Sequence, residues 1–117
     1  MWDIVFYEKE NGEIPVQEFL ETLEVKKKAK ALRGIDLLEE FGSKLGMPQA
    51  RQMEGKIWEL RVIFGGDISR IFYFIHTKRK IILLHGFVKK SDKTPPGEIE
   101  IANKYYNDYL RRSGNEL

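Results

Sequence analysis

The chain of 117 residues contains no cysteine and only two histidines. It therefore has no disulfide framework and no thiolate chemistry, and a structural zinc site is not expected. No apolar run approaches the roughly 20 residues of a membrane-spanning helix, and the first residues lack the basic segment of a secretory signal peptide. We therefore expect a cytoplasmic protein with no cofactor, no metal and no membrane partner.

The length and composition predict one globular domain that spans residues 1–117. The net charge is only +2, but the charges are unevenly distributed. Residues 51–93 hold 10 Lys or Arg against 4 Asp or Glu, a net of +6, whereas the remaining residues hold 10 against 14, a net of −4. The basic part of the chain is suited to bind an anion, or it is simply a solvated basic surface.

Apolar periodicity divides the chain into helical and extended segments. The predicted strands are residues 2–7, 58–64, 68–76 and 81–88, and the predicted helices begin at Pro15, run over 25–45 and follow Thr94 as an N-cap. Consecutive strands with short links pair antiparallel. The order β-α-α-β-β-β-α therefore predicts an α+β fold, in which two N-terminal helices pack on one face of an antiparallel sheet and a C-terminal helix follows.

Charged side chains interrupt the apolar strands at positions that share one face. Arg61 alternates with Leu60 and Val62, so it points to the same side as Glu59. Helices are expected to cover only one face of the sheet, which leaves the other for Arg61 and, if the hairpin register allows, for Arg70. Two adjacent guanidinium groups repel each other unless an anion bridges them, and a phosphodiester does this well.

Basic residues in and after the predicted strand 81–88 provide further functional groups that could take part in RNA cleavage. His85, Lys89 and Lys90 lie within reach of the same face. Metal-free RNA cleavage needs a base for the 2′-hydroxyl, cations for the phosphate and an acid for the leaving 5′-oxygen. Histidine can serve either role near neutral pH, and lysine can act as a base only when its pKa is depressed.

Each of these residues also has a purely structural interpretation. His85 can be a satisfied core residue, Glu59 can pair with a neighbouring cation, and Arg70 can be a structural hydrogen-bond hub. Tyr105 and Tyr106 are suited to stacking on bases, but at their spacing at least one is expected in the core. The residues alone therefore indicate an anion-binding, RNA-facing α+β protein.

Three segments carry a resemblance to a known family. They are MEGKIWELR (53–61), GDISRIFY (66–73) and LLHGFVKK (83–90), the last followed by KTP at 93–95. Together they resemble the RelE/ParE toxin superfamily, and most closely its phage-derived, HigB-like branch. The resemblance covers nearly the whole chain, because the order of elements also matches that fold.

The resemblance implies the toxin of a type II toxin–antitoxin pair. Similar members enter the ribosomal A site and cut mRNA without a metal, and a co-encoded antitoxin, often of the helix-turn-helix type, neutralises them. The sequence departs from RelE at Glu59 and Ile57, where RelE has lysines. The family's basic strand positions fall on Arg61 and Arg70, and its basic position after the strand falls on Lys89 or Lys90. The base is then His85, Glu59 or an amine of Lys89 or Lys90. We predict Arg61, Arg70, His85 and Lys90 as catalytic residues, and the predicted substrate-binding residues are Glu59, Lys89, Lys56, Tyr105 and Tyr106.

Two other functions fit the same pattern. A ParE-type protein on this fold inhibits gyrase by binding and leaves mRNA intact. A catalytically degenerate member would serve only as an interaction module. The expected partners of the leading hypothesis, a ribosome-dependent endoribonuclease that inhibits translation, are the ribosome, mRNA and the cognate antitoxin.

Overall fold

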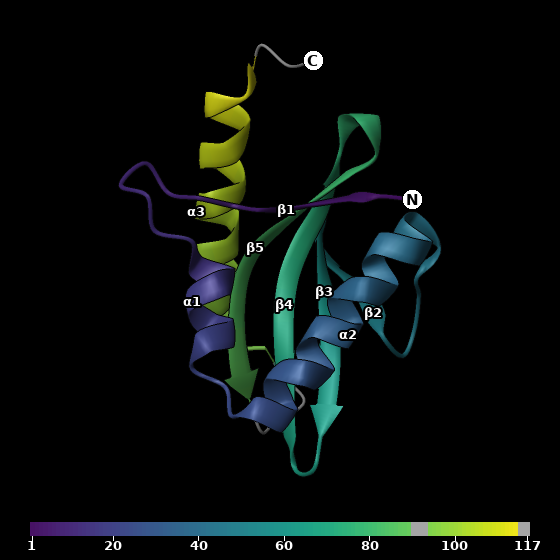
Figure 1. Cartoon of the computed structure of the whole chain (residues 1–117). Coiled ribbons are helices and arrows are strands. Elements are labelled where there is room, and N and C mark those ends of the chain that lie inside the picture. The colour runs from purple at the N-terminus through teal and green to yellow at the C-terminus, as the bar shows by residue number, and fades with distance from the viewer. Residues whose placement is uncertain (90–93, 115–117) are drawn as a thin grey trace.

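The computed structural model describes residues 1–89 and 94–114, with the side chain of Lys78 excepted. Within these residues the fold is a five-stranded sheet with helices on both sides (Figure 1). The strands are β1 (Asp3–Phe6), β2 (Ala50–Glu54), β3 (Ile57–Phe64), β4 (Asp67–His76) and β5 (Lys80–Lys89). The helices are α1 (Pro15–Glu21), α2 (Val25–Phe41) and α3 (Pro96–Arg112), with short 3-10 turns at Gly42–Lys44 and Thr77–Arg79. The predicted α+β class is confirmed.

The sheet has the strand order β1-β5-β4-β3-β2 and differs from the prediction in two ways. Strands β2 to β5 pair antiparallel as expected, but β1 pairs with β5 in parallel. The chain reaches β5 only after two helices and three strands, and such a long crossover is what a parallel pair requires. Strand β2 was not predicted, because it is a short edge strand of mostly polar residues and lacks an apolar alternation.

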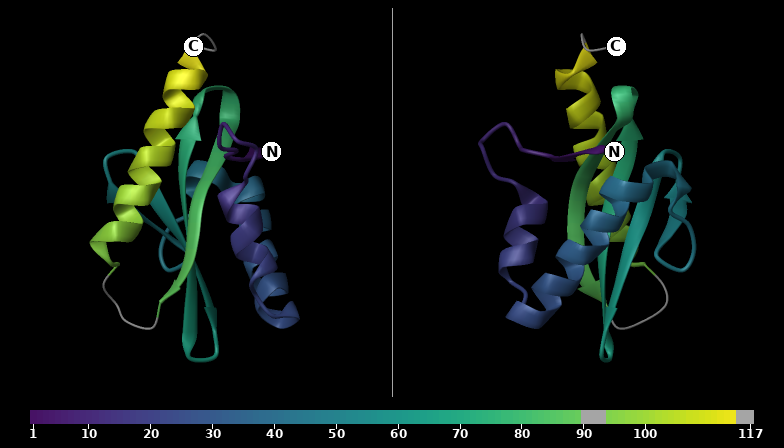
Figure 2. Two further views of the ribbon diagram at one scale, coloured as in Figure 1. Left: turned by 90° about the vertical axis from the view of Figure 1, so that its left-hand side faces the viewer. Right: turned by 45° about the vertical axis from the view of Figure 1, so that its right-hand side comes forward.

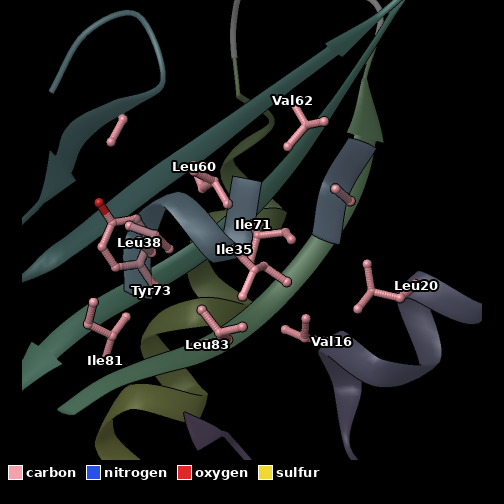
Figure 3. Close-up of a cluster of buried hydrophobic side chains, with 12 residues drawn as sticks. Val16, Leu20, Ile35, Leu38, Leu60, Val62, Ile71, Tyr73, Ile81 and Leu83 are labelled. Carbon is pink, nitrogen blue, oxygen red and sulfur yellow. The ribbon is translucent and has the colours of Figure 1, made fainter. Parts of the chain in front are cut away.

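The first face of the sheet packs against α1 and α2 and forms an apolar core (Figure 3). Its buried members are Val16, Leu20, Ala31, Ile35, Leu38, Ala50, Leu60, Val62, Ile71, Tyr73, Ile81 and Leu83. Gly34 brings α2 close to β3, since a Cβ atom at this position would lie 3.2 Å from Cγ2 of Val62. The ~1 kcal/mol that a glycine costs inside a helix is thus offset by close packing of helix on sheet.

Helix α2 ends at Phe41, whereas the apolar pattern predicted an end at residue 45. Gly42 follows with a φ of 50°, a conformation that favours glycine. A side chain at Gly42 would overlap the indole of Trp2, so the same glycine both ends the helix and admits the N-terminal segment.

Helix α3 packs on the opposite face, against β4 and β5 (Figure 2). The expectation that helices cover only one face is therefore wrong. A second core forms beneath α3, with the buried members Tyr7, Ile57, Phe72, Phe74, Ile82, Leu84, Phe87 and Ala102. Pro95 is the N-cap of α3, so the predicted cap, Thr94, lies one residue too early. None of the described helices is long and apolar enough to span a bilayer.

Candidate active site

The second face changes from apolar to charged toward the β3–β4 turn. The register of the strands places side chains in rows across this face, because partners in neighbouring strands share a side. The rows are Arg51–Glu59–Phe72–His85, then Arg61–Arg70–Phe87, then Ile63–Ile68–Lys89. Arg61 and Arg70 are direct partners, so the hairpin register that the sequence left open does bring them together.

Glu59 is the centre of this charged region. Its side chain is fully buried, with 0% of its surface exposed. One carboxylate oxygen, Oε1, accepts hydrogen bonds from Nη1 of Arg70 at 2.5 Å and from Nε of Arg51 at 3.1 Å. The other, Oε2, accepts from the hydroxyl of Thr94 at 3.2 Å. A buried carboxylate is tolerated only when it is paired and hydrogen-bonded in this way.

Thr94 ties the start of the α3 segment back to the sheet. Its hydroxyl donates to Glu59 and accepts a hydrogen bond from Nζ of Lys89 at 3.3 Å. The same hydroxyl thus links the carboxylate on β3 to the ammonium at the end of β5. This use of the hydroxyl explains why Thr94 does not cap the helix, as the sequence pattern had predicted.

Arg70 is not open to solvent, contrary to the expectation that it would lie on an uncovered face. Only 1% of its surface is exposed, and its Nε atom is buried without a hydrogen-bond partner among the described residues. Arg61 is half-buried, and its Nε is likewise buried and unpartnered within that part of the chain. Arg70 is therefore committed to Glu59, whereas the Arg61 Nε–H has no acceptor within the described chain.

His85 lies at the end of the first row and contacts α3. Its Nε2 atom is 3.3 Å from Oε2 of Glu98, and its ring stacks beside Phe72 and Phe87 at centroid distances of 6.4 and 5.9 Å. The His85 side chain keeps 16% of its surface exposed. It is thus neither a sealed core residue nor a free one, because the Glu98 carboxylate fixes the orientation of a partly accessible imidazole.

The remaining predicted residues are only partly brought together. Tyr105 stacks on Tyr7 at 4.8 Å and meets the His85 ring edge-on at 6.2 Å, so it borders the charged region. Tyr106 packs edge-on against Phe74 at 4.7 Å in the second core. Lys56 is exposed in the β2–β3 turn, and Lys90 lies outside the described residues.

Three guanidinium groups lie beside one buried carboxylate. Among the described residues of the three rows, Arg51, Arg61 and Arg70 stand against the carboxylate of Glu59, which pairs with Arg51 and Arg70. Groups of one sign held this close favour a bound anion, and guanidinium groups suit the oxygens of a phosphate. Among the described residues, no three His, Asp or Glu side chains are grouped so that they could hold a metal ion.

Sequence reasoning missed three participants: Arg51, Thr94 and Glu98. Arg51 belongs to β2, the strand that the apolar pattern did not reveal. Thr94 was predicted as the N-cap of the last helix, and Glu98 lies in the first turn of that helix, where a carboxylate favours the helix dipole. Their contacts with Glu59 and His85 depend on α3 lying on the second face, which no local pattern in the sequence indicates.

A protein-family model matches most of the chain. Residues 18–107, or 90 of the 117, match the family model described as Phage derived protein Gp49-like (DUF891). This range includes the His85–Glu98 pair and the whole Glu59 cluster, which consists of Arg51, Glu59, Arg70, Lys89 and Thr94. No curated protein matches the chain significantly.

Proposed function

Since this chain belongs to the family of phage-derived, Gp49-like proteins, we propose that it is the toxin of a type II toxin–antitoxin pair. The family is of the RelE toxin type and is associated with toxin-like proteins. Within that class we propose a ribosome-dependent endoribonuclease that cuts mRNA without a metal and so inhibits translation. Its partners are then the ribosome, mRNA and a cognate antitoxin of the helix-turn-helix type, and its place of action is the cytoplasm.

The observation that carries the proposal is the group of guanidiniums beside a buried carboxylate. Glu59 pairs with Arg51 and Arg70 and holds Arg70 in place through the 2.5 Å hydrogen bond. Arg61 lies beside Arg70, and its Nε has no acceptor among the described residues. We therefore assign Arg61 to bind the scissile phosphate and to stabilise the negative charge that develops on it in the transition state.

His85 is the residue best suited to move a proton in this site. The Glu98 carboxylate can accept a hydrogen bond from Nε2 of His85 and so orient the ring, as a carboxylate does in many acid–base pairs. Glu59 is a poor base, because both of its oxygens already accept hydrogen bonds. We therefore assign His85 to acid–base catalysis, Arg61 to phosphate binding, and Glu59 and Arg70 to positioning.

The test is cleavage of mRNA on purified ribosomes, mapped by primer extension. The unaltered chain should produce discrete cuts inside the reading frame, and none when the ribosome is omitted. His85→Gln should reduce the cleavage rate by roughly 10²-fold or more, the usual size of an acid–base contribution. Lys44→Ala removes an exposed cation that lies beside Trp2 and Arg79 and makes none of the hydrogen bonds of the cluster, so this control variant should cut normally.

Three outcomes would contradict the assignment. Growth arrest with intact mRNA and damaged DNA would indicate a gyrase inhibitor instead. A soluble, folded chain that leaves both growth and mRNA unaffected would indicate an interaction module. Full cleavage by His85→Gln would remove His85 from the chemistry while leaving the function in place.

A further inference from the structure

A basic groove lies between α2 and β3, outside the Glu59 cluster. It encloses about 520 Å³. Lys30 and Arg33 line it from α2, and Arg61 lines it from β3. None of its lining residues is acidic, and none carries an aromatic ring. A hollow whose charged residues are all cations raises the local concentration of anions.

The cations of the groove lack counter-charges within the described part of the chain. Lys30 and Arg33 are both exposed, and neither forms an ion pair there. The Nε atom of Arg61 is buried without an acceptor among the same residues. Lys27, in the turn before Lys30, is different, because Asp67 at the start of β4 pairs with it. The charges that line the groove are thus available to a ligand.

The order of charges along α2 supports a role in binding. All five of its cations lie between Lys26 and Arg33, and all three of its acids lie between Asp36 and Glu40. This order is the reverse of what the helix dipole favours. Helix α3 has the favourable order, with Glu98 in its first turn and two arginines in its last turn. The basic half of α2 therefore opposes the stability of its own helix, as expected of charges that serve a ligand.

Only the outer edge of β3 separates the groove from the Glu59 cluster. Strand β2 begins opposite Leu60, and beyond the hydrogen bond from the Arg61 amide to the Gln49 carbonyl no described strand covers that edge. Arg61 belongs to both places, because it lines the groove and is the register partner of Arg70. The first turns of α2 lie at the same end of the sheet as the β3–β4 turn (Figure 1). The two basic surfaces are therefore neighbours.

We propose that the groove binds the phosphate groups of an RNA strand that continues from the Glu59 cluster over the edge of β3 onto α2. The inference rests on the proposed function, because it takes the cleaved RNA strand as the ligand. The Arg33 guanidinium can donate two hydrogen bonds to one phosphate, and Lys30 and Arg61 add positive charge beside it. Since no ring is present for bases to stack on, the groove contacts the backbone and carries no base preference. It therefore adds affinity for long strands without selecting their sequence.

The test measures binding of the full chain to single-stranded oligodeoxynucleotides of about 12 residues, which lack the 2′-hydroxyl and so are not cut. Fluorescence anisotropy at several salt concentrations gives the affinity and its salt dependence. Arg33→Gln should weaken binding of oligothymidylate and oligoadenylate by the same factor, roughly tenfold at fixed salt. The slope of log K against log salt should fall by about 0.7, the value for one phosphate contact on a single strand.

Lys26→Gln is the matched control. It removes the same charge from an exposed position of α2 that does not line the groove, so it should keep the slope of the unaltered chain. The groove and the endoribonuclease fail separately. Arg33-dependent binding by a chain that does not cut mRNA leaves the groove in place. Normal cleavage, with equal binding by Arg33→Gln and Lys26→Gln, removes the groove and leaves the endoribonuclease.

The proposal is overturned if Arg33→Gln has the salt slope of Lys26→Gln, or if its loss of affinity differs between oligothymidylate and oligoadenylate. A stoichiometry of two oligonucleotides per chain would place the groove and the Glu59 cluster on separate strands and overturn it as well. Inorganic phosphate is the last probe. If it displaces the oligonucleotide at an equal concentration of phosphate groups, the groove binds single anions and not a strand.

Discussion

The two faces of the sheet differ in what their buried groups do. On the first face, α1 and α2 cover an unbroken apolar core, and burial of that surface stabilises the fold. On the second face, α3 covers a smaller aromatic core, and toward the β3–β4 turn the buried residues are charged. Burial of apolar side chains on the first face thus stabilises the fold, whereas part of the second face holds charged groups that can bind an anion. The buried pair of Glu59 and Arg70 serves both purposes, because it stabilises the second face and belongs to the charged region.

The largest change in stability is expected when the buried ion pair between Glu59 and Arg70 is broken. Arg70→Ala leaves the Glu59 carboxylate buried with one donor fewer, so it should destabilise the protein by about 3–5 kcal/mol. The double variant Glu59→Leu/Arg70→Met should recover most of that loss, because an apolar pair needs no partner. Urea denaturation followed by circular dichroism measures both.

The same double variant also separates stability from function. It should fold but fail to cleave mRNA, since the carboxylate that binds Thr94 and the guanidinium beside Arg61 are gone. A single Arg70→Ala variant as stable as the unaltered chain would mean that the second face is not held together by this pair.

A smaller effect is expected from overpacking the first face. Gly86 lies under the Phe19 ring of α1, and a Cβ atom on Gly86 would overlap that ring. Gly86→Ala should therefore destabilise the protein by ~1–3 kcal/mol. Combining it with Phe19→Leu should restore part of the loss, as thermal unfolding of the single and double variants would show. Equal melting temperatures for Gly86→Ala and the unaltered chain would argue against the tight contact.

Replacing Arg61 should change the stability of the protein little but should clearly weaken its binding of RNA, unlike replacement of Arg70. Arg61→Gln removes one cation, so binding of single-stranded RNA should fall roughly tenfold at fixed salt. The slope of log K against log salt should also fall by about 0.7, the value for one phosphate contact on a single strand. Fluorescence anisotropy at several salt concentrations measures both. An unchanged slope would remove Arg61 from the phosphate contacts.

The smallest effect concerns a charge cluster at the opposite end of the second face. The hydroxyl of Tyr7 and the guanidinium of Arg112 bond to Asp108 and lower the pKa of its carboxyl to about 2. Since the pKa of Asp108 is lower in the folded state, its contribution is present above about pH 4 and is lost as the pH falls toward 2. Exposed pairs of this kind contribute up to about 1 kcal/mol.

Asp108→Asn should therefore flatten the pH dependence of stability between pH 2 and 4 and leave the Glu59 cluster intact. Denaturation of both chains across that pH range is the measurement. Parallel curves for the two chains would mean that Asp108 does not contribute to acid stability.

Local patterns in the sequence were sufficient for some elements and not for others. Strands β3, β4 and β5 were predicted within a residue or two, because apolar and β-branched residues fill them. The alternation also placed Glu59 and Arg61 on the same side of β3 correctly. Strand β2 was missed because its residues are polar.

The sequence was sufficient to predict which residue types form the candidate site, but not which of them make hydrogen bonds and ion pairs with one another. Alternation shows which side of a strand a residue occupies, but not which face of the sheet a distant helix covers. Arg70 therefore looked open to solvent, and Thr94 looked like a helix cap. Both errors have one cause: α3 packs on the second face and brings Thr94 within hydrogen-bonding distance of Glu59.

The parallel pairing of β1 with β5 has a consequence for how the chain matures during synthesis. Asp3 pairs in register with Lys80, and the hydroxyl of Tyr7 donates to Asp108, so residues 3–7 reach their native partners only after residues 80 and 108 have been synthesised. Contacts of such long sequence separation form slowly. A nascent chain in which Lys80 is still inside the ribosomal tunnel has β1 unpaired and Glu59 without Thr94. Residues as far as Asp108 must leave the tunnel before the native state is reached.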